Sequence, residues 1–362
     1  MYFGLSEEQQ FFQDTIAKYL EDNVTIEAVR EYAKGDNQRF ADDIHQGLVE
    51  LGINNLIIPE QYGGLGLDLL YAAAVSQSLG AGIAPVPYIG SYVMAPMAII
   101  LAGSMDQKTK YLNAISSHEL HFGFGATEYI ASRENAGIVI DGNTASGRSL
   151  FVIDGFNASH FILTTKEGTI FIVNADDPNL EVIQLTTIDK TSEISELILS
   201  NCQIEVLEES INNTSIIERV VDIGRIMIAS DSLGASQTMI DKSVDYSKER
   251  KQFGRVIGSF QAVKHMCAEM TANIQPCYSM IWYAAHCQDN IPEESRLMAT
   301  HTKAHVSDTA SSIAKTSTEV HGGMGFTDDL GLHYWFKRIG LNRQLLGGVE
   351  INREEAAKVQ GF

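Results

Sequence analysis

Basic residues are scarce in this sequence. Its 362 residues include 26 lysines and arginines against 46 aspartates and glutamates, which gives a formal net charge of -20 at pH 7. Because such a surface repels the phosphates of a nucleic acid, we expect no nucleic-acid partner. The length predicts two or three domains with a substantial core.

Long apolar runs and closely spaced cysteines are also lacking. No uninterrupted apolar stretch reaches the roughly 20 residues that cross a bilayer, and no basic region followed by an apolar run opens the chain. The cysteine spacings are too long for a zinc site. The four are Cys202, Cys267, Cys277 and Cys287. We therefore expect buried free thiols, no metal, no membrane insertion and the reducing cytoplasm.

The hydrophobic pattern changes twice along the chain and predicts three domains. Residues 1–118 and 207–362 follow the 3.6-residue period of helices, whereas residues 119–206 hold short β-prone runs broken by glycine turns. The expected fold class is therefore α+β: an N-terminal helical domain, a middle antiparallel β-domain and a C-terminal four-helix bundle. The predicted strands are Leu120–Ala126, Ala136–Asp141, Ser149–Ile153, His160–Thr164, Thr169–Val173 and Leu180–Gln184, and the predicted long helices are Ile216–Glu249, Gln261–Asp289 and Glu293–Val320.

Two glycine-containing turns in the last domain have the chemistry of a dinucleotide site. In Glu249-Arg250-Lys251-Gln252-Phe253-Gly254, the Arg250 guanidinium can bind a phosphate through two hydrogen bonds, Phe253 offers a flat face, and Gly254 permits a tight turn. The second turn, His321-Gly322-Gly323-Met324-Gly325-Phe326, follows about seventy residues later. Either turn alone is more often surface structure, but together they indicate two halves of a pyrophosphate site.

With these motifs the chain resembles the acyl-CoA dehydrogenases, a family of flavoproteins. The resemblance covers nearly the whole chain and rests on phrases that occur in the family order. They are Phe3-Gly4-Leu5-Ser6-Glu7-Glu8-Gln9, Leu51-Gly52-Ile53 with Ile58-Pro59-Glu60-Gln61-Tyr62-Gly63-Gly64-Leu65-Gly66, and the two turns above. It implies a tetramer built from dimers, FAD across a dimer interface, α,β-dehydrogenation of an acyl-CoA thioester, and electron transfer to an electron-transfer flavoprotein.

The resemblance also implies which residues contact FAD. Arg250, Gln252 and Phe253 would reach the FAD that is bound mainly to the neighbouring subunit, and Gly322, Gly323 and Gly325 would lie against its adenosine end. Near the second turn this sequence departs from the family pattern, because the family usually has Gln where this chain has Glu319. An ionised carboxylate only accepts hydrogen bonds and is unfavourable beside a phosphate, unless it points at a ribose hydroxyl.

The catalytic base of the family is missing from both of its usual positions. The family reaction needs a Glu that removes the α-proton of the substrate while hydride passes to the flavin. Leu346 occupies the first position, before Gly347-Gly348, and Gly224 occupies the second, before Arg225. Gly224 either leaves room for a bulky substrate or a partner side chain, or reflects a site no longer used. Displaced bases remain conceivable one and two helical turns before Arg225, at Asp222 and Glu218, and less so at Glu350.

The expected flavin loop of the middle domain departs from the family as well. Thr127-Glu128 is followed by Tyr129-Ile130-Ala131-Ser132-Arg133, without the usual glycines, and Phe151 and Ile153 replace a Trp and a Thr that the family places near the flavin ring. The flavin pocket of this chain is therefore predicted to be eroded, whereas the half that it offers to a neighbour is intact.

Three interpretations follow from this asymmetry. The first is a subunit of a heterotetramer, in which a second acyl-CoA dehydrogenase-like subunit carries the base; such heteromers act on bulky acyl-CoA substrates, notably steroid side chains. The second is a self-sufficient homotetramer with Glu218 or Asp222 as relocated base. The third is a flavin-free acyl-CoA-binding scaffold, against which Arg250 and Phe253 argue.

Overall fold

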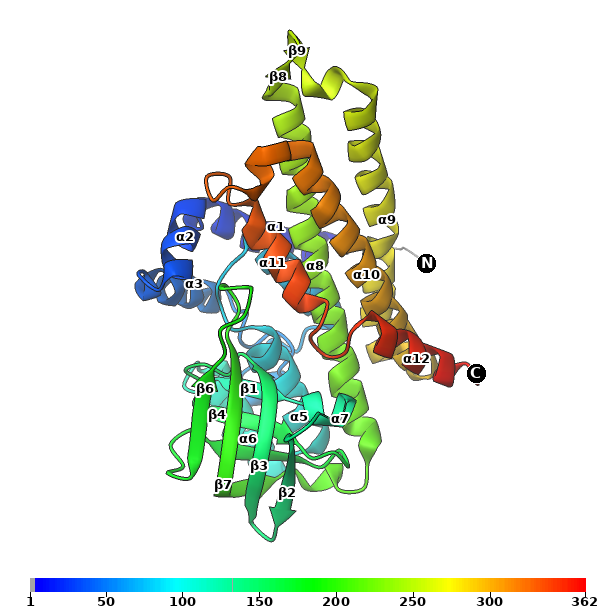
Figure 1. Cartoon of the computed structure of the whole chain (residues 1–362). Helices are drawn as coiled ribbons and strands as arrows, with labels where there is room; N and C mark the ends of the chain where they lie inside the picture. The colour runs from blue at the N-terminus through cyan, green and yellow to red at the C-terminus, as the bar shows by residue number, and fades with distance from the viewer. Residues whose placement is uncertain (1–3, 132) are drawn as a thin grey trace.

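The computed structural model describes residues 4–131 and 133–362. Helices form one end of the molecule and a β-domain the other, and a long central helix connects them (Figure 1). This arrangement confirms the expected order of helical, β and helical regions. Phe3 of the first family phrase and Ser132 of the expected flavin loop lie outside the described residues.

The N-terminal region is helical, as its apolar spacing predicts. Ser6 starts the first helix with a capping box: its hydroxyl accepts a hydrogen bond from the Gln9 N–H, and the Gln9 side chain accepts one from the Ser6 N–H. A π-helical segment, a rare form often found at functional sites, precedes the fifth α-helix. The elements are α1 (Glu7–Asn23), α2 (Ile26–Lys34), α3 (Gln38–Glu50), η1 (Glu60–Tyr62), α4 (Leu69–Gly82), η2 (Ile89–Met94), α5 (Ala95–Ala102) and α6 (Met105–Ser116).

The middle region forms a seven-stranded sheet with the order β2-β3-β1-β4-β5-β7-β6. An additional pairing of β3 with β7 closes five of these strands into a ring. The elements are β1 (Phe122–Gly125), the short helix α7 (Thr127–Ile130), β2 (Gly137–Asp141), β3 (Thr144–Ile153), β4 (His160–Thr164), β5 (Ile170–Asn174), β6 (Leu180–Gln184) and β7 (Ile194–Val206).

Two details of this sheet differ from the sequence-based expectation. The sheet is not purely antiparallel, because β1 pairs with β4 in parallel. β3 runs opposite to β1 and the chain reverses once more before β4, so β4, on the other side of β1, runs in the same direction as β1. The strand β7 was not predicted, since polar residues such as Ser200 and Asn201 interrupt its apolar pattern.

The C-terminal region consists of three long helices and two shorter ones. The long helices match the predicted ranges within three residues at each end, because their apolar period persists over many turns. A two-stranded hairpin connects the first two at the end of the bundle remote from the β-domain (Figure 1). The elements are η3 (Glu208–Ser210), α8 (Thr214–Glu249), β8 (Lys251–Gln252), β9 (Arg255–Val256), η4 (Ile257–Ser259), α9 (Gln261–Asn290), α10 (Pro292–His321), η5 (Gly322–Phe326), α11 (Leu332–Asn342) and α12 (Val349–Val359).

The helix α8 is the central element of the fold, and every residue from Val220 to Ser236 is buried. At Gly234 its backbone lies directly against the Gln77 carbonyl of α4, where any side chain would collide. A glycine is therefore required by the close approach of the two helices. Within the described residues, every helix is too short or too polar to span a bilayer.

Candidate functional site

The two positions where the family carries its base meet in the structure. A Cβ atom built on Gly224 would lie 2.6 Å from Cδ1 of Leu346 and 2.5 Å from Sδ of Met94, which belongs to η2. All three residues are buried. The space in front of Gly224 is therefore filled by two apolar side chains of the same chain, and this favours packing over spare room as the reason for the glycine.

Arg225 fixes the loop that carries Leu346. Its guanidinium is 1% exposed, and Nε donates a hydrogen bond of 3.0 Å to the Leu346 carbonyl oxygen. The same guanidinium donates to both carboxylate oxygens of Glu355 on α12, at 2.6 and 2.9 Å, and to Asp222 at 3.0 Å. Because one guanidinium binds all of these partners at the same time, Arg225 connects α8, the Leu346 loop and α12.

Two carboxylates are considered from the sequence as substitute bases. Asp222 is part of this network of charged side chains, and Glu218 lies beside it. Asp222 is 2% exposed, and its two oxygens accept hydrogen bonds from Arg225 and from Arg296. Burial raises the pKa of Asp222 to about 6, although both arginines oppose the rise. Glu218 lies 3.4 Å from the Tyr129 hydroxyl, which donates to it, and 3.8 Å from Arg296. A role for either carboxylate as base stays a prediction.

A cavity of about 210 Å³ lies between the β-domain and the C-terminal helices. Thr127 and Phe151 line it from the β-domain, Leu346 lines it from the loop before α12, and Glu350 lines it from the first turn of α12. The structure thus brings together the positions at which the sequence departs from the family flavin pocket. Neither Glu218 nor Asp222 is among the residues that line this cavity.

A β-bulge points Phe151 into the cavity. Between Ser149 and Val152 the strand β3 has one more residue than its partner β7, and Phe151 takes a left-handed backbone conformation with φ of 54°. The buried Glu128 carboxylate stabilises the bulge, because it accepts hydrogen bonds of 2.8 Å from the Leu150 N–H and 3.2 Å from the Ser149 hydroxyl. Burial raises the pKa of Glu128, against the effect of these hydrogen bonds. The Thr-Glu phrase thus has a structural role in shaping the cavity wall.

The walls of this cavity are mostly apolar, and the cationic side chain of Arg133 lies against the bulge at Phe151. The guanidinium of Arg133 is 5.2 Å from the centre of the Phe151 ring, within the range of a cation–π contact. The phosphate-binding glycines of the usual flavin loop are replaced by bulkier residues such as Ile130. The apolar walls of the cavity therefore suit a flavin ring, but the cavity offers few groups that could bind a pyrophosphate.

The predicted Arg250 turn lies at the opposite end of α8, in the β8–β9 hairpin. Arg250, Gln252 and Phe253 are exposed, and the Phe253 side chain is 91% exposed. Phe253 has a φ of 54° and Gly254 a φ of 78°, so the chain reverses there in a left-handed turn. Exposing a Phe in such a conformation is unfavourable in an isolated chain, and this arrangement is typical of a residue that contacts a ligand or partner.

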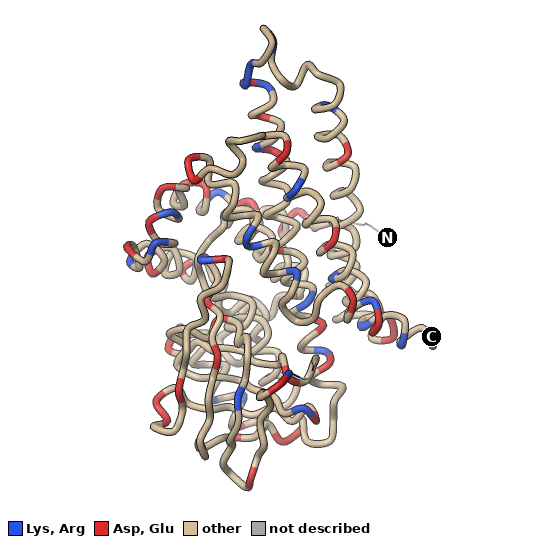
Figure 2. The backbone as a smooth tube through the Cα atoms, viewed as in Figure 1, with Lys and Arg blue, Asp and Glu red and all other residues tan. Residues whose placement is uncertain are grey.

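Positive charge gathers at this tip of an otherwise acidic chain. Lys248, Arg250, Lys251 and Arg255 lie within eight residues, and Glu249 is the acidic residue among them. Figure 2 shows lysines and arginines at the end of the bundle, while residues of both charges are spread over the rest of the backbone. The tip therefore has the charge and the exposed guanidinium that a pyrophosphate requires.

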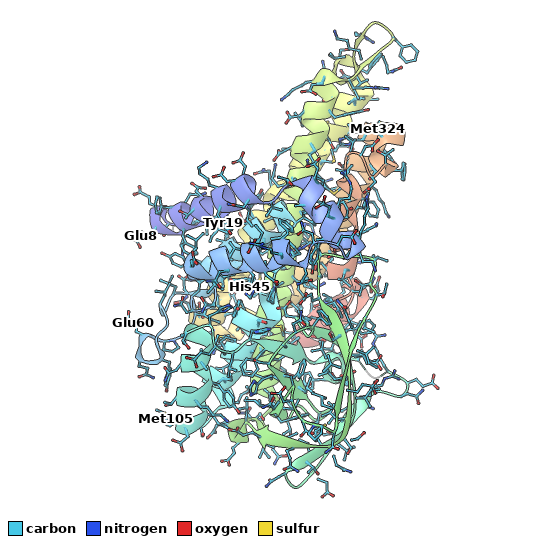
Figure 3. The ribbon with its side chains drawn as sticks, turned by 90° about the vertical axis from the view of Figure 1, so that its left-hand side faces the viewer. Glu8, Tyr19, His45, Glu60, Met105 and Met324 are labelled. Atoms are coloured by element: carbon cyan, nitrogen blue, oxygen red, sulfur yellow. The ribbon has the colours of Figure 1, made fainter. Side chains whose placement is uncertain are left out.

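The second glycine turn lies on the same part of the bundle. The ring of His321, at the end of α10, packs 4.6 Å from the ring of Tyr246, one turn before Arg250. Gly322 and Gly323 are exposed with no other atoms within 4 Å of a built Cβ, whereas Gly325 packs against the Thr318 carbonyl. Glu319 is exposed. Figure 3, in which Met324 is labelled, shows this turn beside the outer half of α8.

The tip is far from the cavity of its own chain. Arg250 follows Gly224 by 26 residues of α8, and at 1.5 Å per residue this is a separation of about 39 Å along the helix axis. The cavity beside Leu346 and the exposed Arg250 turn therefore form two separate candidate sites at distant points of α8.

Comparison with known proteins places this geometry in a family. Residues 6–119 match the model of the acyl-CoA dehydrogenase N-terminal domain, and residues 214–360 match that of the acyl-CoA dehydrogenase C-terminal domain. The chain belongs to the acyl-CoA dehydrogenase family. Members of this family are flavin-dependent oxidoreductases that act on CH–CH bonds.

Individual relatives cover almost the whole chain. Acyl-CoA dehydrogenase IpdE2 of Mycolicibacterium smegmatis is 26% identical over 344 residues, which are 95% of this chain and 96% of the relative. A chain of the ChsE4-ChsE5 complex from Mycobacterium tuberculosis superposes with a TM-score of 0.90 at 24% identity, over 100% of both chains. The Tcur3481-Tcur3483 steroid ACAD superposes with a TM-score of 0.87 at 23% identity, over 98% of both chains.

Sequence reasoning missed residues that shape the site of this acyl-CoA dehydrogenase chain. Met94 fills the space in front of Gly224 from a segment more than a hundred residues earlier, and Glu355 neutralises Arg225 from α12. Glycines at Gly90 and Gly224 were the available signals, because each marks a close approach; a Cβ on Gly90 would lie 2.7 Å from the Ile153 carbonyl oxygen. Neither glycine identifies its neighbour, however.

Proposed function

We propose that this chain is a subunit of an FAD-dependent acyl-CoA dehydrogenase and completes the FAD site of a second, unlike subunit that carries the catalytic Glu. The observation that carries the proposal is the separation of about 39 Å between the cavity beside Leu346 and the exposed turn of Arg250 and Phe253. Residues so far from the cavity of their own chain can serve only the FAD of a neighbour.

The chemistry of the tip residues supports this role. The Arg250 guanidinium would bind the pyrophosphate through two hydrogen bonds, and Phe253 would pack against a flat part of the cofactor. Gly322 and Gly323, open to solvent, would allow the adenosine end to approach the backbone. A bound FAD would supply the acceptor for the hydride that leaves the β-carbon of the acyl group.

The lack of a base at both family positions of this chain supports the unlike partner. Leu346 cannot take a proton, and Gly224 has no side chain. The carboxylate of Asp222 is engaged by two arginines and buried behind the network, and Glu218 faces Tyr129 and Arg296. A homotetramer with one of these as relocated base is therefore the less favoured alternative.

We further propose a bulky acyl-CoA, such as a steroid side-chain CoA, as substrate of the complex, with an electron-transfer flavoprotein as acceptor. One structural neighbour is described as a steroid ACAD, and another as a complex of two differently named chains. These likenesses support the substrate class, which the fold alone leaves open.

The position of the base tests the proposal directly. The complex is purified through a tag on this chain, and its turnover of acyl-CoA is measured. Two variants change this chain, Glu218→Gln and Asp222→Asn. A third variant changes the partner, in which Gln replaces the Glu at the family base position. We expect the partner substitution to abolish turnover, with a decrease of 10²-fold or more, and Glu218→Gln to leave it unchanged. Loss of turnover with Glu218→Gln or Asp222→Asn, while the complex keeps its fold and flavin, would favour the homotetramer.

A further inference from the structure

The space in front of Gly224 is where an acyl group would meet the base, because both family base positions border it. Here it is occupied by the chain itself. Sδ and Cε of Met94 lie 2.5 and 2.8 Å from a Cβ built on Gly224, and Cδ1 of Leu346 lies 2.6 Å from it. Met94 is fully buried and Leu346 is 7% exposed, so neither side chain swings freely into solvent.

The segment that carries Met94 is held firmly at its start. One carboxylate oxygen of Asp154, at the end of β3, accepts hydrogen bonds from the N–H groups of Tyr88, Gly90 and Ser91 at 3.0, 2.7 and 3.1 Å. The Ser91 hydroxyl also donates a 2.6 Å hydrogen bond to the Phe122 carbonyl oxygen of β1. The free N–H groups at the start of η2 are thus satisfied by the β-domain, which fixes the helix in position.

A second set of contacts holds the middle of the same segment. The Tyr92 hydroxyl lies 2.8 Å from Nε2 of His45 on α3 and 3.2 Å from Nδ1 of His118. His45, labelled in Figure 3, lies on the helix that packs over this part of the molecule. Because η2 is anchored by the β-domain on one side and by α3 on the other, Met94 is a fixed part of the core.

Two cavities lie near these side chains, and neither has Met94 among its lining residues. One, lined by Tyr88, Ile153 and Leu345 among others, measures about 40 Å³, and the other, which Leu346 lines together with Phe151, measures about 210 Å³. Both are smaller than usual ligand pockets of roughly 300 to 1,000 Å³. The space directly in front of Gly224 is therefore filled by Met94 and Leu346, and an acyl group has no room there.

We propose that Met94 and Leu346 fill the acyl cleft of this chain, so that it excludes the acyl group of an acyl-CoA. Each pair of unlike subunits then binds one acyl group, at the partner's base. This inference rests on the proposed function for the identity of the cleft. It adds that the chain is silent in substrate binding as well as in proton transfer, and that Met94 is the residue that closes the cleft.

The dependence of affinity on acyl length tests this exclusion. The full chain is titrated calorimetrically with butanoyl-CoA and octanoyl-CoA. In an open apolar cleft each buried methylene raises affinity about 4-fold, and four of them raise it roughly 200-fold. We expect the two affinities to agree within about 2-fold in the wild-type chain. An octanoyl-CoA affinity that exceeds the butanoyl-CoA affinity by 20-fold or more would overturn the proposal.

Removal of the methionine provides the converse test. Met94→Ala is expected to create an apolar cavity in front of Gly224 and to introduce a preference of at least about 10-fold for octanoyl-CoA over butanoyl-CoA. Met239→Ala, at a fully buried methionine on α8, is the matched control and should leave the ratio unchanged. An equal gain in both variants, or none in a folded Met94→Ala, would contradict the role of Met94. These outcomes are independent of flavin binding at Arg250, so failure here leaves the subunit role standing.

Discussion

Arg225 and Leu346 are joined by a 3.0 Å hydrogen bond from the buried guanidinium to the carbonyl oxygen of the leucine. The bond joins Leu346, on the loop before α12, to the residue that follows Gly224 on α8, so it holds together the two positions at which the family resemblance places a base. Leu346 itself takes a left-handed conformation with φ of 55°, which is strained for a residue with a side chain. Arg225 therefore stabilises a loop geometry that the leucine alone would not adopt.

Replacing this arginine is expected to destabilise the chain strongly. Arg225→Met leaves the buried carboxylate of Asp222 and the partly exposed carboxylate of Glu355 with Arg296 as their shared hydrogen-bond partner, and breaking such a network costs about 3–5 kcal/mol of unfolding free energy. Urea denaturation measures the loss. Arg39→Met is the control, because its ion pair with Asp43 is exposed and should contribute less than about 1 kcal/mol. Equal losses in the two variants would refute the bracing role.

Gly224→Ala is expected to destabilise the chain by about 1–3 kcal/mol, although alanine is the better helix former. The added Cβ would lie within 2.6 Å of Met94 and Leu346, and Met94 is fully buried. In a Met94→Ala background the penalty should shrink, and a double-mutant cycle measures this coupling. Gly323→Ala, with nothing near the built Cβ, should be almost neutral. A stabilising Gly224→Ala would show that the space is open.

Arg250→Ala and Phe253→Ala are expected to remove flavin from the purified complex without unfolding the chain. Both side chains are exposed, so the unfolding free energy should change by less than about 0.5 kcal/mol. Flavin absorbance per complex and urea denaturation separate the two effects. Lys251→Ala, at the adjacent exposed cation, should retain most of the flavin. If both variants keep all of the flavin in the complex, this chain does not help to bind it. That result would favour the interpretation of this chain as a flavin-free scaffold.

The contribution of His45 to the stability of the chain is expected to fall as the pH drops from about 6.5 towards 3. Burial lowers the pKa of His45 from 6.5 to about 3, with smaller contributions from His118 and His121. Between these values the unfolded chain binds a proton that the native chain does not, so acid favours unfolding by up to about 1.4 kcal/mol per pH unit.

His45→Gln should make the acid limb of the stability curve less steep, since its amide can still bond to the Tyr92 hydroxyl and does not titrate. Burial raises the pKa of the nearby Glu193 to about 7, and this group acts in the opposite direction in both proteins. The comparison of urea denaturation at several pH values therefore isolates His45. Parallel curves for the two proteins would show that His45 titrates normally.

The sequence predicted the long elements better than the contacts between them. The three long helices follow from an apolar period that is sustained over about thirty residues. The turn at Phe253 follows from the next residue, Gly254, which readily takes a left-handed conformation. The contact of Met94 with Gly224 could not be anticipated, because the apolar run around Met94 has no distinctive period and Met94 ends the π-helix η2 just before α5.

The candidate site shows the same limit. The residue types predicted that Leu346 and Gly224 provide no base. Their mutual contact and the pairing of Arg225 with Glu355 depend on residues more than a hundred positions apart, which no local pattern encodes. Likewise, the support that Glu128 gives to the bulge at Leu150 needed the strand register.

The ratio of flavin to protein chains in the complex purified through this chain tests the central claim most directly. The account predicts one FAD for two unlike chains, with the base in the partner. One FAD per chain in a tetramer of this chain alone would contradict it, and would return attention to Glu218 and Asp222.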